Sequence, residues 1–165
     1  LVTTRSKLAY KKHDQFDITS CRLIDNLCQN TEAKIVISSS WREGRSKENL
    51  ADILRYNGIS KEHLNEDWAT PILRDNRLKE IKEWLARHPE VDHWAIIDDD
   101  LDFTNEHPRL VLTVYEDGLL FEHIIRLIAL LDGNLEKWLQ DSGEKSSSTD
   151  AKKIEMIKKN LKKVC

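Results

Sequence analysis

Two short apolar runs in this chain each end abruptly in polar side chains. Residues 34–37 lead into three serines, and residues 94–97 lead into three aspartates. Short runs rich in Ile and Val are typical of parallel strands that are buried on both faces. In an open parallel sheet the carboxyl ends of the strands share one edge, where ligands bind. If the two runs are neighbouring strands, that edge brings together Ser38, Ser39, Asp98 and Asp99.

The first 131 residues alternate between helical and extended patterns. We expect helices from a cap at Asp17 or Thr19 to about Gln29, and over residues 46–57, 75–87 and 119–131. We expect strands over residues 34–38, 93–98 and 110–112, with residues 58–72 irregular. Helices between parallel strands predict an α/β fold with one parallel sheet covered on both faces, in three layers.

The composition changes near residue 142 and indicates three parts. Residues 1–141 form the expected domain, and one domain is the normal content of 165 residues. Residues 142–150 are rich in serine and typical of a linker. Residues 151–165 place apolar residues three and four apart among six lysines, which predicts a basic amphipathic helix. We expect this tail to contact a membrane surface or a partner, to begin a further domain, or to be solvated; its unfinished pattern at Cys165 favours a longer chain.

Cysteine usage and hydropathy predict a cytoplasmic protein of a reducing compartment. No stretch reaches the roughly 18 apolar residues of a membrane span, and the N-terminal residues lack a signal-peptide pattern. The three cysteines show no metal-ligand spacing. Cys21 and Cys28 lie seven residues apart, so they share one face of the expected helix, where we expect buried free thiols.

The charge of the chain is unevenly distributed. Residues 1–141 hold 19 Lys and Arg against 26 Asp and Glu, a net charge of −7, whereas residues 142–165 are basic. An acidic domain is a poor electrostatic match for a nucleic-acid backbone, although a local basic patch can oppose the total. The charge therefore favours protein over nucleic acid as the macromolecular partner, by a modest margin.

The polar residues at the strand ends suit a phosphate held beside a metal ion. Adjacent carboxylates repel one another unless a cation or water neutralises them, and Asp98 with Asp99 offers the oxygen ligands that Mg²⁺ takes. A serine hydroxyl at the other strand end can donate to a phosphate oxygen. Arg74, Arg77 and Lys79 lie at the start of the intervening helix, and such a cation can balance the charge of a transferring phosphoryl group. Each feature also has an ordinary structural explanation: an acidic turn, a helix cap or a solvated surface base.

Along the chain, a strand followed by hydroxyls precedes a basic helix start and a strand followed by carboxylates. In this order the motifs resemble those of the haloacid dehalogenase (HAD) phosphohydrolase superfamily, and most of all the HAD domain of Swiss Army Knife RNA-repair proteins. The resemblance rests on Ser-Ser-Ser-Trp-Arg at 38–42, Arg-Leu-Lys-Glu-Ile at 77–81, Ile-Ile-Asp-Asp-Asp at 96–100 and Leu-Val-Leu-Thr at 110–113. It covers roughly residues 1–131. The chain is similar, more weakly, to bacterial effector phosphatases, which would act in a host cell.

The resemblance implies two groups of site residues. The first holds the phosphoryl group: Ser38 or Ser39 for its oxygen, and Arg77 or, less favourably, Lys79 for its charge. The second holds Mg²⁺, directly or through water: Asp98 and Asp99. In addition, Trp41 and Arg42 follow the serines and are expected to contact the substrate, with Arg42 adding a charge-assisted hydrogen bond.

One motif of the superfamily is missing where the resemblance would place it. HAD phosphatases carry Asp-x-Asp, whose first aspartate forms an aspartyl-phosphate and whose second is the general acid and base. In the family this motif runs into a segment similar to residues 1–3, so we expect it just upstream of Leu1. The alternatives are a non-catalytic remnant, and a permuted chain in which Asp100-x-Asp102 is the nucleophile motif.

The spacing of the motifs predicts a site without a cap domain. Neither residues 1–38 nor residues 41–77 have room for a substantial insertion. Within the resemblance, capless members act on phosphoproteins, including phosphotyrosine, and on nucleic-acid ends. We therefore expect a Mg²⁺-dependent phosphomonoesterase that prefers phosphoprotein. A nucleic-acid end phosphatase and an inactive HAD-fold binding module are the alternatives, and the oligomeric state stays open.

Overall fold

The computed structural model describes residues 16–74, 76–99, 107–135, 137 and 138, and four positions near the C-terminus. The expected linker at 142–150 lies outside these residues. In the expected amphipathic tail the described positions, Lys152, Glu155, Met156 and Lys159, are helical. Within the described residues no helix is long and apolar enough to cross a membrane.

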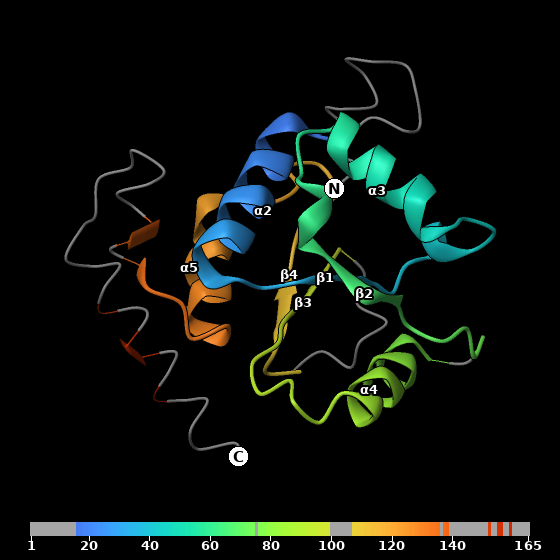
Figure 1. The fold of residues 1–165 in the computed structure, drawn as a ribbon. Coiled ribbons are helices and arrows are strands. Elements are labelled where there is room, and N and C mark those ends of the chain that lie inside the picture. The colour runs from blue at the N-terminus through green and yellow to red at the C-terminus, as the bar shows by residue number, and fades with distance from the viewer. Residues whose placement is uncertain are drawn as a thin grey trace.

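Helices alternate with short strands along the chain (Figure 1). The α-helices are α2 (Ile18–Thr31), α3 (Lys47–Tyr56), α4 (Arg77–Arg87) and α5 (Phe121–Leu130). The strands are β1 (Ile35–Ile37), β2 (Leu64–Ala69), β3 (Ile96–Asp98) and β4 (Leu110–Leu112), and the short 3-10 helices are η1 (Ser40–Arg42) and η2 (Lys61–His63). Every helix and strand expected between residues 17 and 131 is present, with its ends shifted by a few residues at most.

Local signals explain where α2 and α3 begin. The side chain of Asp17 accepts a hydrogen bond from the Ser20 N–H at 2.8 Å. The hydroxyl of Ser46 accepts one from the Asn49 N–H at 3.3 Å. Gly58 follows the end of α3 with a φ of +86°, a conformation that favours glycine. Because such caps depend on neighbouring residues only, the sequence predicts them well.

The strands form two parallel pairs, which corrects the expectation of one sheet. β1 pairs with β2, and β3 pairs with β4; within the described residues no ladder joins the two pairs. The run that ends in serines and the run that ends in aspartates therefore belong to different pairs, and are not neighbouring strands as expected. The β1–β2 register shifts between Ile35 and Ile37, whereas the β3–β4 register is regular. A three-layer, capless arrangement stays a prediction.

Strand β2 lies in the segment 58–72, and the prediction that this segment is irregular is wrong. Its sequence, Leu-Asn-Glu-Asp-Trp-Ala, contains no apolar run, and of its residues only Leu64 is fully buried. Backbone pairing with β1 makes the segment extended, and the pairing continues where the Thr70 N–H donates to the Ile37 carbonyl at 3.1 Å. A strand defined by pairing rather than by its own hydropathy leaves little trace in the sequence.

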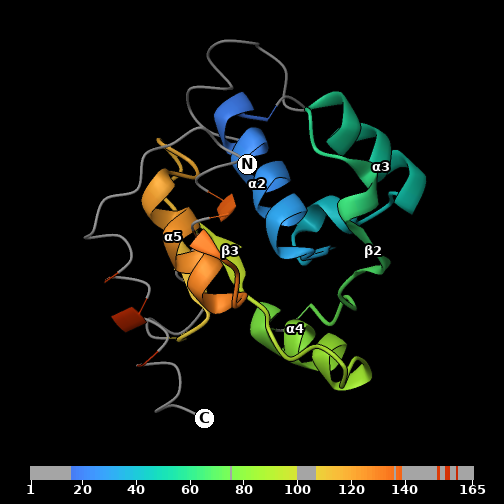
Figure 2. The same cartoon turned by 60° about the vertical axis from the view of Figure 1, so that its left-hand side comes forward.

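Most of the core lies around α2 and α5, which Figures 1 and 2 show side by side. Ile124, Leu127 and Ile128 of α5 are at most 1% exposed. Cys21 and Cys28 of α2 are buried free thiols, as the sequence predicts. Burial raises the pKa of each thiol to about 12. Both cysteines therefore stay protonated at neutral pH and are poor nucleophiles.

Helices α4 and α5 pack on opposite faces of the β3–β4 pair, since the adjacent residues Leu110 and Val111 join different apolar clusters. The buried Trp84 of α4 also donates from its Nε1 to the Asp67 carbonyl of β2 at 2.8 Å. Helix α4 thus touches both strand pairs. These contacts fix the position of its first residue, Arg77.

Candidate active site

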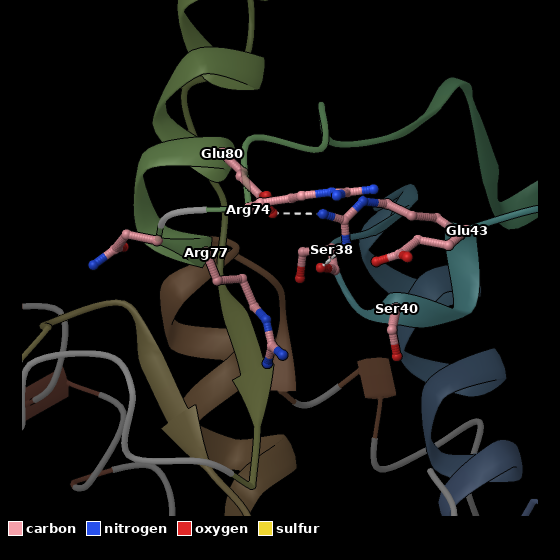
Figure 3. Close-up of a pocket in the computed structure, with 8 residues that line it drawn as sticks. Ser38, Ser40, Glu43, Arg74, Arg77 and Glu80 are labelled. Atoms are coloured by element: carbon pink, nitrogen blue, oxygen red, sulfur yellow. Dashed lines mark hydrogen bonds and ion pairs between the residues drawn. The ribbon is translucent and has the colours of Figure 1, made fainter.

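A cavity of about 390 Å³ opens between the loop that follows β1 and the beginning of α4 (Figure 3). Its lining residues are Ser38, Ser40, Arg42, Glu43, Arg74, Asn76, Arg77 and Glu80. All of them are polar or charged, and three are arginines. A cavity of this composition is suited to an anion rather than to an apolar ligand, because guanidinium groups form charge-assisted hydrogen bonds.

Arg42 shapes the loop that carries Ser38. The chain turns through η1 directly after β1, and the Arg42 guanidinium folds back onto it. Its Nη1 donates hydrogen bonds to the carbonyls of Ser38 and Ser39, the latter at 2.8 Å. Its Nη2 lies 3.4 Å from the Pro71 carbonyl. These bonds hold Ser38 at the edge of the cavity.

A buried ion pair ties this loop to α4. Arg42 Nη2 lies 2.5 Å from Glu80 Oε2, and both side chains are 6% exposed. The other carboxylate oxygen of Glu80 accepts a hydrogen bond from the Leu73 N–H at 2.8 Å. Arg42 is therefore engaged with the scaffold as well as with the cavity, and its predicted contact with substrate stays a prediction.

The first residue of α4 meets the acidic end of β3. Arg77 Nη1 lies 2.5 Å from Asp98 Oδ2, with side-chain exposures of 32% and 10%. Asn76 caps the helix, its Oδ1 accepting from the N–H groups of Leu78 at 2.8 Å and Lys79 at 3.3 Å. Because the cap fixes the start of α4, Arg77 contacts β3 while it lines the cavity.

The structure brings together three of the residues that the sequence singles out. Ser38 and Arg77 line the cavity, and Asp98 is bonded to Arg77. The two strand ends therefore converge although their strands are not paired. Figure 3 shows Ser38 between Arg77 on one side and the η1 loop on the other. This placement favours Ser38 over Ser39, and Arg77 over Lys79, as the residues that meet a ligand.

Two other predicted site residues have different surroundings. Trp41 packs on Phe16, with ring centroids 5.1 Å apart, and Arg45 lies over its ring. Asp99 follows Asp98 and is exposed. Neither Trp41 nor Asp99 belongs to the lining of the cavity that the described residues form. Their roles in substrate and metal binding stay predictions.

The sequence alone did not single out four lining residues: Ser40, Glu43, Asn76 and Glu80. The position of Glu80 in the sequence could have identified it. It precedes the buried Trp84 by one helical turn, so it lies on the buried face of α4. A carboxylate there needs a cationic partner. Nothing local identifies that partner, because Arg42 is 38 residues away.

The acidic end of β3 offers the type of ligand that Mg²⁺ takes. Mg²⁺ commonly keeps several waters and binds one or two carboxylates, so the adjacent Asp98 and Asp99 are a suitable donor set. Among the described residues, His, Cys, Asp and Glu side chains form no cluster of three. Carboxylates are the type of donor that Mg²⁺ takes, and its binding by Asp98 and Asp99 stays a prediction.

Helices that alternate with parallel strands define an α/β domain. Near one cavity of this domain lie a hydroxyl, an arginine and the carboxylate paired with that arginine. Residues 2–124 match the family described as the HAD domain in Swiss Army Knife RNA repair proteins. The match spans most of the chain, and the chain belongs to this HAD family. The resemblance inferred from the motifs is confirmed. No curated protein and no solved structure matches the chain, so the roles of single residues depend on the geometry described above.

Proposed function

We propose that this chain is a Mg²⁺-dependent phosphomonoesterase of HAD type that acts through an aspartyl-phosphate. The observation that carries the proposal is one polar cavity lined by Ser38 and by Arg77, which is paired with Asp98. Membership of the HAD family supports a hydrolase in general. The metal, the covalent step and the substrate are the finer parts of the proposal.

Each of the three residues has a distinct task in this reaction. The Ser38 hydroxyl donates a hydrogen bond to a phosphoryl oxygen, and Arg77 stabilises the negative charge that develops on the phosphoryl group. A guanidinium has several N–H donors, so Arg77 can keep Asp98 while it binds phosphate. Asp98 and Asp99 would hold Mg²⁺, which when bound neutralises charge on the phosphate.

The attacking aspartate of this reaction lies outside the described residues. The motif expected upstream of Leu1 and the alternative Asp100-x-Asp102 both fall there. For the described residues the proposal therefore concerns phosphate binding, charge stabilisation and metal binding. An inactive binding module with the same cavity is the alternative, and it would still bind phosphate.

The open cavity suits phosphate carried on a macromolecule. Phosphoprotein, including phosphotyrosine, is the preferred substrate because residues 1–141 carry a net charge of −7. A nucleic-acid end is the second candidate. Two observations favour it: arginines line the cavity, and the matching family is described from RNA repair proteins. The basic residues 151–165 are proposed to contact a partner or a membrane surface.

The metal and the reaction are tested together by phosphate release from an aryl phosphate. We expect release by the full-length protein to need Mg²⁺ and to fall at least about tenfold in Asp98→Asn and Asp99→Asn, because a metal ligand is lost. The matched control is Asp52→Asn, on the exposed face of α3. Release that is unchanged in both site variants would remove the metal site from the proposal.

The two substrate classes are separated by competition. A phosphotyrosine peptide and a 3′-phosphorylated oligonucleotide are offered at low and at high salt. We expect preference for the peptide with a weak dependence on salt. A preference for the oligonucleotide that collapses as salt rises would favour nucleic-acid ends, since phosphate-backbone contacts release counterions.

A further inference from the structure

Arg74 differs from the other two arginines of the cavity because it has no carboxylate partner among the described residues. Arg42 pairs with Glu80 and Arg77 pairs with Asp98. Arg74 is exposed, lines the cavity, and makes no side-chain hydrogen bond or ion pair with any residue that the structure describes. An anion that enters the cavity can therefore bind to the Arg74 guanidinium without first displacing a carboxylate.

The backbone of Arg74 is also unusual. Its φ is +54°, in the left-handed region that residues other than glycine rarely adopt. The segment is held on both sides, because the Leu73 N–H donates to Glu80 and Asn76 caps α4. Strained positions of this kind cluster at ligand sites. Glycine would adopt the same conformation freely, so the local geometry alone gives no reason for an arginine here.

A second donor at the same cavity has no partner. Arg42 is 8% exposed, and its Nε is buried without a hydrogen-bond partner among the described residues. Its two terminal nitrogens already bind Glu80 and backbone carbonyls. Buried donors without partners are rare in folded proteins. The Nε of Arg42 has almost no solvent-accessible surface, so an anion in the cavity would accept from it only if the neighbouring side chains moved.

We propose that Arg74 binds a second phosphate group of the substrate. This subsite lies next to the one that Ser38 and Arg77 form for the reacting phosphoryl group, so the inference rests on the proposed function. It narrows the substrate to phosphomonoesters that carry another phosphate nearby. The planar guanidinium suits this role, because it binds phosphate oxygens in pairs.

Glu43 opposes this subsite from the other side of the cavity. Its side chain is exposed and lines the cavity from the loop after η1, and Figure 3 shows its carboxylate turned toward Ser38. A carboxylate in this place repels every anion that enters. Arg74 and Glu43 therefore have opposite effects on the affinity for the same ligand. Replacing Arg74 should weaken binding, and replacing Glu43 should strengthen it.

The test is calorimetric binding of orthophosphate and of pyrophosphate to the full chain, at fixed free Mg²⁺. We expect pyrophosphate to bind about tenfold more tightly than orthophosphate, as one additional charge-assisted contact provides. Arg74→Gly should reduce that ratio to about one and leave orthophosphate binding unchanged within about twofold. Glu43→Gln should strengthen the binding of both. The matched arginine Arg45, which donates to the Trp41 carbonyl, should be replaceable by alanine without effect.

Unfolding cannot account for the expected result, since Arg74→Gly relieves a left-handed φ and should raise the melting temperature. Equal weakening of both ligands by Arg74→Gly, or no weakening of either, would overturn the subsite. The proposed function is tested separately by Arg77→Ala, which should weaken orthophosphate as well. A wild-type chain that binds neither ligand would overturn both proposals.

Discussion

Two arginine–carboxylate pairs flank the cavity, and they differ in burial rather than in length. Arg42–Glu80 and Arg77–Asp98 both have nitrogen–oxygen distances of 2.5 Å. Both side chains of the first pair are 6% exposed, whereas Arg77 is 32% exposed. Loss of one partner leaves a buried charge uncompensated in the first pair, while water reaches the second.

This difference in burial indicates different roles for the two ion pairs, one structural and one in the proposed site. The buried pair joins the loop of Ser38 to α4, and its members also hold backbone groups on both sides. The partly exposed pair joins the start of α4 to the end of β3, at the edge where the proposed ligand would bind. We therefore expect the same two functional groups, at the same distance, to hold the fold together in one place and to bind a ligand in the other.

The largest effect is expected from breaking the buried pair. Arg42→Ala leaves Glu80 charged and buried, and should lower the free energy of unfolding by about 3–5 kcal/mol. Chemical denaturation followed by circular dichroism measures this change. Since a domain is typically stable by about 5–15 kcal/mol, the variant should be close to unfolding at body temperature.

Two controls isolate the burial of the pair. Arg87→Ala removes an exposed pair with Asp67, 3.1 Å long, and should change stability by less than about 1 kcal/mol. The double variant Arg42→Met with Glu80→Leu removes both charges and should recover much of the loss. If Arg42→Ala were no worse than Arg87→Ala, the buried pair would not be the link between loop and helix.

The partly exposed pair should show the reverse pattern. Arg77→Ala should slow phosphate release about 10²–10³-fold, the usual effect of removing one donor that stabilises developing charge. Its effect on the free energy of unfolding should stay below that of Arg42→Ala, because Arg77 is partly solvated. Steady-state kinetics and denaturation of the same preparation measure both.

The matched control for Arg77 lies two residues further along α4. Lys79 is exposed, and the cavity lining does not include it. Lys79→Ala should therefore retain the wild-type rate within about twofold, a margin below the effect of one hydrogen bond. A Lys79 variant slower than the Arg77 variant would reverse the assignment of the charge-stabilising residue.

The contrast between the two pairs also explains which parts of the site the sequence predicts. The sequence singles out three residues of the site because each lies at the boundary of an element. Ser38 follows the end of β1, Arg77 begins α4, and Asp98 ends β3. The sequence predicts the basic partner of Asp98 only in part, since Arg77 and Lys79 lie on the same turn of α4. The cap at Asn76 and the packing of α4 decide between them.

Other features depend on contacts between distant segments and could not be predicted. Strand β2 becomes extended by pairing with β1, and Glu80 finds its partner 38 residues away. The left-handed φ of Arg74 is held by Glu80 through Leu73, so it has no local signal either. The separation into two strand pairs is likewise a property of the whole arrangement.

A third pair, whose nitrogen–oxygen distance is similar and whose carboxylate is fully exposed, completes the series and should have the smallest effect. Lys47 Nζ lies 2.6 Å from Glu66 Oε2, and the Glu66 side chain is 98% exposed. The hydrogen bond from Lys47, more than any other contact, holds the pKa of Glu66 below its usual value. Glu66→Gln should leave the melting temperature at neutral pH unchanged within error, because solvent screens such pairs.

The pH dependence of this exposed pair has a definite sign. A carboxyl whose pKa is lower in the folded than in the unfolded state stabilises the fold above the unfolded pKa, about 4.3. That contribution disappears as the pH falls through the folded pKa. A carboxyl titration followed by NMR should show the Glu66 midpoint return toward its usual value in Lys47→Met, and in about 1 M salt. If Glu66→Gln destabilised the chain as much as Arg42→Ala, contact length rather than burial would control these pairs, and the distinction between scaffold and ligand site would fail.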